Sequence, residues 1–177
     1  MAKEYEYHVF QPITTAQYQE SFYKAIGQNW ALLTSGTKDK ANTMTVSWGG
    51  VGVLWNKDVV FVFVRNSRYT KELLDSSGVF SLSFLDHEVY SREYKYLGAA
   101  SGRNEDKIAA ARLHVAAKLG VPYIDEAATV ILCTSLFKQE LTTDAAHFLA
   151  PGLDEKFYAD KDYHNLYVGE VVKIMCR

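Results

Sequence analysis

Alternating apolar and polar positions predict β-strands through much of the chain. Residues 43–48 carry a hydroxyl side chain at every second position, with Met, Val and Trp between them, so this strand would have one packing face and one hydrogen-bonding face. Residues 59–64 read Val-Val-Phe-Val-Phe-Val, which predicts a central strand buried on both faces. The other strand-like segments are residues 30–36, 79–85, 128–138 and 165–174.

Apolar residues at helical spacing predict the connections between these strands. We expect a short helix within residues 14–26, with Thr14 or Thr15 as its N-cap. A second helix is expected over residues 68–74, with Ser67 as its N-cap. The remaining segments are residues 49–52, where glycines are expected to interrupt a strand, a turn at 56–58, helices over 87–97 and 105–119, and a partly helical excursion over 141–157.

The order of these elements indicates the fold class. The connections between the early strands are too short for helical crossovers, which favours a mainly β, antiparallel barrel with peripheral helices over an alternating parallel α/β sheet. We expect one domain over residues 1–177, in which residues 1–12 form an N-terminal arm. A chain of 177 residues that is 48% hydrophobic does not need a disulfide or a structural metal. At this length, folding buries about 70% of the surface that the unfolded chain exposes.

Charge and cysteine content narrow the class of protein. A formal net charge of −2 argues against a dedicated nucleic-acid-binding protein, whose domain is usually basic. Cys133 and Cys176 follow no disulfide or metal-ligand pattern and the five histidines lack ligand spacing, so no metal site is expected. No apolar run approaches the ~18 residues of a membrane helix, and no secretion signal opens the chain. We therefore expect a cytoplasmic protein with neither a membrane nor a nucleic-acid partner.

The first candidate binding segment is residues 65–70, where a strand leads directly into a helix. The free N–H groups and the positive dipole end of a helix N-terminus favour a phosphate. The side chains that would complete an anion site are those of Arg65, Ser67, Arg68, Tyr69, Thr70 and Lys71. The alternative is an ordinary capped helix with solvated charges.

Three further segments are candidates for ligand contact. In residues 42–50, hydroxyl side chains and terminal glycines would suit the polar edge of a planar heterocycle; a half-exposed edge strand is the alternative. Residues 101–107 form a polar loop with Ser, Gly, Arg and Lys, and a solvated turn is the alternative. His164 lies in a turn ahead of the last strand, where a surface histidine is the alternative.

The chain has no Rossmann glycine motif, Walker sequence or nucleophile elbow.

Taken in order, these segments resemble the flavin reductase-like family, and within it the flavoredoxin-type branch of the FMN-binding split barrels. The resemblance runs from about residue 30 to the C-terminus. The segments that carry it are 30–36, 42–49, 62–65 with 68–70, 101–103 with 106–107, and 163–164 with 167–171. The resemblance implies a split antiparallel β-barrel that forms a homodimer, with FMN at or near the interface between the subunits.

The resemblance also implies which residues bind the flavin. Those implied to line the isoalloxazine ring are Thr43, Met44, Thr45, Val46, Ser47 and Trp48, next to Asn42. Those implied to hold the phosphate are Arg65, Ser67, Tyr69 and Thr70, in agreement with the argument from the helix terminus. Those implied to approach the cofactor from a further loop, or from the second subunit, are Ser101, Gly102, Arg103 and Lys107.

Aromatic residues make up 14% of the chain, and we expect them to divide between core and ligand. The aromatic residues assigned to the cores of strands are Phe61, Phe63, Phe80 and Phe84. The candidates for contact with a flat ligand are Trp48, Tyr69 and Tyr163.

His164 is the residue that the resemblance places beside a nicotinamide. In related reductases a histidine stands five residues ahead of the glycine in the last strand's Gly-x-Val, and His164 and Gly169 keep that spacing. Here Tyr163 separates Asp162 from His164, where some relatives have Asp-His directly.

The activity that the resemblance implies is hydride transfer from NAD(P)H to FMN, followed by delivery of electrons to a small-molecule or protein acceptor. Because the cofactor performs the chemistry, no catalytic triad is required. One alternative is an FMN-binding electron-transfer protein that a protein partner reduces, without NAD(P)H activity. Another is a flavin-binding module without turnover.

Overall fold

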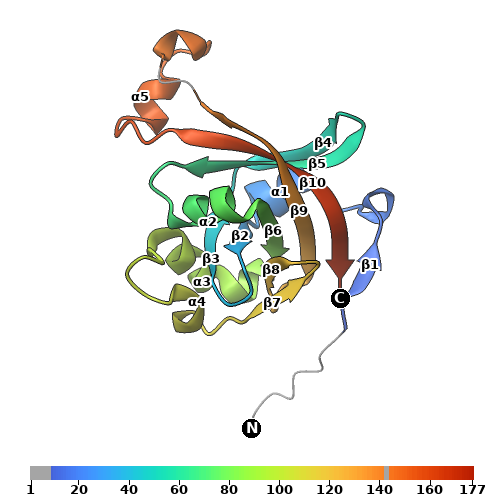
Figure 1. The fold of residues 1–177 in the computed structure, drawn as a ribbon. Helices are drawn as coiled ribbons and strands as arrows, with labels where there is room; N and C mark the ends of the chain where they lie inside the picture. Colours follow the sequence, from blue (N-terminus) through green and yellow to red (C-terminus); the bar gives the residue numbers. More distant parts are fainter. Residues whose placement is uncertain (1–8, 142–143) are drawn as a thin grey trace.

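The computed structural model of the chain describes residues 9–141 and 144–177, and Figure 1 shows its fold. Its strands are β1 (Gln11–Ile13), β2 (Ala31–Gly36), β3 (Ala41–Val46), β4 (Gly49–Leu54), β5 (Lys57–Arg65), β6 (Val79–Phe84), β7 (Val115–Lys118), β8 (Val121–Ile124), β9 (Thr129–Glu140) and β10 (His164–Cys176). Its helices are η1 (Thr15–Gln17), α1 (Phe22–Gly27), α2 (Tyr69–Ser77), α3 (His87–Ala99), α4 (Lys107–Ala110), η2 (Ala145–His147) and α5 (Leu153–Phe157). The predicted class, mainly β and antiparallel with peripheral helices, is confirmed.

One antiparallel sheet forms the body of the protein. Its strands pair in the order β3-β2-β6-β9-β10-β5-β4, and β1 pairs with the C-terminal part of β10. Within the described ranges the two end strands, β3 and β4, form no ladder with each other, so hydrogen bonds do not close the sheet into a barrel. The predicted central strand, β5, does lie inside the sheet, between β10 and β4.

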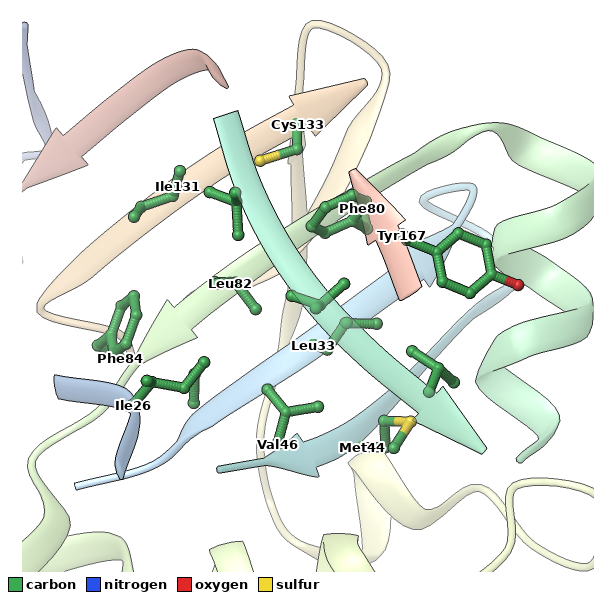
Figure 2. Packing of buried hydrophobic residues seen from close by; sticks show 14 of the residues in the cluster. Ile26, Leu33, Met44, Val46, Phe80, Leu82, Phe84, Ile131, Cys133 and Tyr167 are labelled. Atoms are coloured by element: carbon green, nitrogen blue, oxygen red, sulfur yellow. The ribbon is translucent and has the colours of Figure 1, made fainter. Parts of the chain in front are cut away.

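The sheet curls around an apolar core. Side chains from β2, β3, β5, β6, β9 and β10 meet in one buried cluster, which Figure 2 shows from close by. Strands of one sheet can surround a common cluster only if the sheet bends, as Figure 1 shows for β9 and β10. Tyr167 of β10 has its ring in this core, and its hydroxyl donates to Asp75 of α2 at 2.7 Å. This contact attaches α2 to the sheet.

A second cluster packs on the other side of the sheet. It combines Leu32 and Leu132 of the sheet with Tyr94 and Leu97 of α3 and with residues of β7 and β8. α3 also packs against β3, and its C-terminal end lies near the start of α2, where Arg68 donates to the Gly98 carbonyl.

The predicted helix over residues 105–119 is wrong. Helix α4 ends at Ala110, and the chain then forms the hairpin β7–β8. Leu119 and Gly120 connect the hairpin strands with φ of 53° and 77°, the left-handed backbone that a two-residue turn of this kind requires. The apolar spacing of the segment fits a helix as well as a hairpin. Gly120, which favours a tight turn, was the one signal in the sequence for the hairpin.

The glycine-rich segment after residue 48 also differs from expectation. Its glycines do not interrupt a strand but lie within β4, which pairs with β5. The turn between them is formed by Trp55 and Asn56, with φ of 53° and 57°, and not by residues 56–58.

The helix expected within residues 14–26 is two separate elements, η1 and α1, and Thr14 caps η1 as predicted. Helix α2 has Arg68 and not Ser67 as its N-cap, because both Ser67 donors bind the Asp162 carboxylate. Of the expected arm, residues 1–8 lie outside the described residues, and residues 11–12 belong to β1.

Helices in the described ranges are all too short or too polar to span a bilayer. In the same ranges, no three His, Cys, Asp or Glu side chains are grouped closely enough to hold a metal ion.

Gly169 tests how tightly the core is packed. A Cβ at this position would lie 2.5 Å from the Phe80 ring and 2.9 Å from the Cys133 Cβ. We expect Gly169→Ala to lower the free energy of unfolding by about 2–3 kcal/mol, because neither neighbour can withdraw. Gly27→Ala, which has open space around it, should change it by less than about 0.5 kcal/mol. Urea unfolding measures both, and equal effects would contradict the packing argument.

Candidate functional site

Two adjoining cavities lie where β3 ends and α2 begins. The first, which we call the β3 cavity, has a volume of about 190 Å³; its lining residues are Met44, Thr45, Val46, Ser47, Trp48, Phe63, Arg65, Arg68 and His164. The second, the α2 cavity, has a volume of about 80 Å³; its lining residues are Asn42, Met44, Ser67, Arg68, Tyr69, Thr70, Ala99, Ala100, Ser101, Gly102 and Lys107. Because Met44 and Arg68 line both, the two cavities form one cleft.

The structure thus brings together most of the residues that the sequence singled out. Those that line neither cavity are Thr43, Arg103, Lys71 and Tyr163. Thr43 is fully buried, and its hydroxyl bonds with Thr34 at 3.0 Å and with the Leu33 carbonyl at 3.2 Å. The Lys71 ammonium lies 2.9 Å from the Asp75 carboxylate, within its own helix.

Arg103 supports the α2 cavity from outside. One of its guanidinium nitrogens donates to the Ser67 carbonyl at 2.9 Å, another pairs with Glu72, and the group lies over the Tyr69 ring. It also lines a neighbouring hollow together with Lys107. Arg103 therefore holds the residues before and after the start of α2 in place.

A close backbone contact shapes the α2 cavity. A Cβ on Gly102 would lie 2.1 Å from the Asn42 Oδ1 atom, so any other residue here would displace the Asn42 side chain. The Asn42 amide in turn donates to the Thr70 hydroxyl at 2.8 Å. The loop after α3, strand β3 and the first turn of α2 are thereby packed against one another.

Two cations of the cleft are held by main-chain carbonyls of α3. Arg68 donates to the Gly98 carbonyl at 2.9 Å, and Lys107 donates to those of Leu97 and Ala100 at 2.8 and 2.9 Å. The C-terminal end of a helix carries a partial negative charge, which favours cations there. Among the described residues, neither cation forms an ion pair with a carboxylate, so both charges remain available to an anionic ligand.

Lys107 is 3% exposed, and its surroundings lower the pKa of its ammonium. Burial, with the nearby charge of Arg68, lowers the pKa of its ammonium to about 8. An anion in the α2 cavity would stabilise the protonated form and raise this pKa again.

Arg65 lies at the other end of the cleft, in the β3 cavity only. It donates to the carbonyls of Phe157 and Asp162 at 2.9 and 3.1 Å and forms an ion pair with Asp160 at 3.2 Å. The sequence predicted Arg65 beside the phosphate-binding residues, but its guanidinium anchors the segment that follows α5.

His164 begins β10, opposite Arg65 on β5. Its Nδ1 atom lies 2.9 Å from the Tyr158 hydroxyl, and its ring lies 4.9 Å from that of Trp48. Burial, together with the charges of Arg65 and Arg68, lowers the pKa of His164 to about 4, although Asp162 and Asp160 act in the opposite direction. The imidazole is therefore neutral at physiological pH.

Three aromatic assignments change, and one of them is Phe61, which the sequence assigned to a strand core but which is only half-buried and belongs to neither apolar cluster. Tyr163, a candidate for the flat ligand, is buried against Tyr158 with ring centroids 4.7 Å apart, and it donates to Asp154 at 2.7 Å. Phe63, which the sequence assigned to a strand core, lines the β3 cavity instead. The alternation of β5 could have shown this: Val62 and Val64 are fully buried on the core face, so Phe63 points to the opposite face.

The β3 face that the sequence predicted for hydrogen bonding is partly used within the fold. The Thr45 hydroxyl donates to the Tyr94 carbonyl of α3, and a Cβ on Gly98 would lie 3.3 Å from Thr45. Hydrogen bonds to a ligand at this strand would therefore come mainly from the backbone and from Ser47.

Comparison with known proteins places this geometry in a family. The chain matches the family model of the flavin reductase like domain over residues 23–177. A search of curated proteins found no match.

Solved structures share the fold. A flavoredoxin from Methanosarcina acetivorans is 24% identical, with a TM-score of 0.63 over 84% of this chain and 68% of that one. An FMN-binding domain of flavin reductase-like enzymes from Shewanella baltica is 14% identical, with a TM-score of 0.66 over 96% and 79%. An NADH:FAD oxidoreductase from Streptomyces globisporus is 15% identical, with a TM-score of 0.61 over 84% and 75%. With the family model matching all but the N-terminal part of the chain, this protein belongs to the flavin reductase-like family.

Proposed function

We propose that this protein binds FMN in the cleft and is an oxidoreductase that accepts hydride from NADH or NADPH. The observation that carries the proposal is the pair of cations, Arg68 and Lys107, beside the first turn of α2 and without carboxylate partners among the described residues. A site that gathers uncompensated positive charge and helix N–H groups is suited to a phosphate.

The residues of the cleft fit the two halves of FMN. The phosphate would lie in the α2 cavity, where Ser67, Thr70 and Ser101 add hydroxyl groups to the cations. The ring system would lie in the β3 cavity, whose apolar lining includes Met44 and Phe63. Known structures of an FMN-binding domain from Shewanella baltica and of flavoredoxins with this fold support the assignment of the ligand.

The size of the cleft supports a homodimer. Its cavities measure about 190 and 80 Å³, whereas sites that enclose a drug-sized ligand measure roughly 300–1,000 Å³. FMN in this cleft would remain partly uncovered by one chain. We propose that a second copy covers it, which places the cofactor at the interface.

Bound FMN would supply the hydride acceptance and electron transfer that the protein's own side chains cannot provide. The chain's contribution is to bind and orient the reactants. Arg68 and Lys107 hold negative charge at one end of the cleft, and His164 with Trp48 lines the other end. The cytoplasmic location expected from the sequence stays a prediction.

Reduction by nicotinamide nucleotides tests the proposed activity directly. We expect purified, FMN-loaded protein, mixed without oxygen with NADH and in parallel with NADPH, to lose the visible flavin absorbance with at least one of them. Free FMN at the same concentration is the control. If neither nucleotide reduces the bound flavin while dithionite does, the protein is not an NAD(P)H-dependent reductase. An electron-transfer protein that a protein partner reduces would then be the better assignment, as in the alternative that the sequence left open.

The pKa of Lys107 predicts a pH-dependent affinity for FMN. The ammonium loses its proton as the pH rises through about 8, whereas the phosphate is already a dianion at pH 7 because its second pKa is about 6. We expect the Kd of FMN to rise by about 10-fold between pH 7 and pH 9, with little change for riboflavin, which has no phosphate. Fluorescence titration of both ligands measures this.

Lys107→Met should weaken FMN binding at pH 7 to the level of the wild type at pH 9, and the pH dependence should disappear. Lys71→Met is the matched control, because Lys71 is paired with Asp75 and lines neither cavity. Parallel losses of FMN and riboflavin affinity in Lys107→Met would contradict a phosphate in the α2 cavity.

A further inference from the structure

Tyr158 and His164 form a buried pair behind the β3 cavity. Tyr158 is 5% exposed and His164 is 8% exposed, and the phenol oxygen lies 2.9 Å from Nδ1 of the imidazole. Tyr158 directly follows α5, whereas His164 opens β10. The sequence singled out His164 but gave no reason to connect it with Tyr158.

The surroundings of Tyr158 fix the position of its phenol oxygen. One face of its ring stacks on Tyr163, with centroids 4.7 Å apart and an interplanar angle of 17°. The guanidinium of Arg65 lies 5.6 Å from the centroid of the same ring, and Arg65 also binds the carbonyl of Phe157 next to it. With the ring held in this way, the phenol oxygen stays within hydrogen-bond distance of His164 Nδ1.

Hydrogen-bond accounting determines which nitrogen of His164 carries the proton. Burial raises the pKa of Tyr158, so its phenol is protonated and has one O–H to donate. In the described part of the chain, the hydrogen-bond partner of the Tyr158 hydroxyl is Nδ1 of His164. A buried O–H that did not donate to it would be left without an acceptor, which is costly. Nδ1 is therefore the acceptor, and the neutral imidazole carries its proton on Nε2.

The Nε2–H group is available to a ligand. Nε2 makes no hydrogen bond with residues 9–141 and 144–177. The fully buried side-chain atoms without a partner in these ranges are Glu93 Oε2 and Ser135 Oγ, so Nε2 is not among them. His164 lines the β3 cavity. Burial has the largest effect on the pKa of His164 and lowers it; of the charged groups around the imidazole, Arg65 and Arg68 also lower the pKa, whereas Asp162 and Asp160 raise it, and the net result is a neutral ring.

We propose that Tyr158 is a positioning residue: it holds His164 as the Nε2–H tautomer, so that the β3 cavity offers a neutral N–H donor to a carbonyl or carboxamide oxygen of the molecule that exchanges hydride there. The assignment of that molecule rests on the proposed function; the tautomer does not. An Nε2–H group can donate to an acceptor oxygen, and it cannot accept a proton at Nε2. His164 thus orients a reactant and is not a general base.

The tautomer can be measured without FMN or turnover. In 15N-labelled protein, long-range 1H–15N spectra of the imidazole distinguish a protonated Nε2 from a protonated Nδ1. We expect wild-type His164 to be the Nε2–H form, and Tyr158→Phe, which keeps the ring and removes only the hydroxyl, to give a mixture of both forms. Tyr163→Phe is the matched control, because its hydroxyl binds Asp154 and not His164. A protonated Nδ1 in the wild type, or an unchanged spectrum in Tyr158→Phe, would overturn the proposal.

Two variants of His164 test the donor itself. The amide of His164→Gln can place an N–H near the position of Nε2, whereas that of His164→Asn reaches only the position of Nδ1. With FMN-loaded protein and NADH, we expect Asn to raise KM by about 5-fold, the loss of one neutral hydrogen bond, and Gln to recover most of that loss. Equal values for Gln and Asn would overturn the donor role. A wild type that NADH and NADPH fail to reduce would overturn the proposed function instead, and the spectra would still decide the role of Tyr158.

Discussion

The cleft depends on two cations that bind the end of one helix. Arg68, at the N-cap of α2, and Lys107, at the start of α4, both donate to carbonyls in the last turn of α3 or just beyond it. These bonds join three helical elements and set the loop of residues 101–106 against β3. Carbonyl oxygens accept hydrogen bonds from the two side chains without cancelling their positive charge, whereas carboxylates would accept hydrogen bonds and also cancel the charge. The contacts that build the site therefore leave it positively charged.

The opposite end of the cleft uses the same principle for a different purpose. Arg65 also donates to main-chain carbonyls, those of Phe157 and Asp162, but it has Asp160 as an ion-pair partner as well. Its charge is partly compensated, and its main effect is to hold the segment after α5 over β5 and β10. The cleft thus runs from an end at α2, where two cations have no carboxylate partner among the described residues, to an end at His164, where Arg65 is paired with Asp160. An anionic group and an uncharged ring system would find separate, matching environments.

Local patterns predicted the strands and the region of the site, but not the partners of the charged residues. The alternation of residues 43–48 and the apolar run of residues 59–64 predicted β3 and β5 because each strand has a face that must be buried. Residues 65–70 and 101–107 were expected near one ligand, and the structure places residues 67–70 of the first segment and Ser101, Gly102 and Lys107 of the second at the α2 cavity. No local pattern shows that Arg65 binds a segment more than 90 residues away, or that Asp162 takes the hydroxyl of Ser67 from the start of α2. Such contacts arise only when the sheet is assembled.

The hydrogen-bond partner of the His164 Nδ1 atom determines the chemistry expected of the histidine. The Asp162 carboxylate accepts from the N–H and hydroxyl of Ser67, at 3.0 and 2.6 Å, and His164 has the phenol of Tyr158 at its Nδ1 atom. A carboxylate at Nδ1 would stabilise a protonated imidazole, whereas a neutral phenol that donates to Nδ1 stabilises the unprotonated ring. Hydride exchange requires that the reactants be held in line, and it does not require a proton at this position. The phenol of Tyr158 at Nδ1, in place of a carboxylate, therefore favours the proposed orientation of a reactant by His164 over acid–base chemistry.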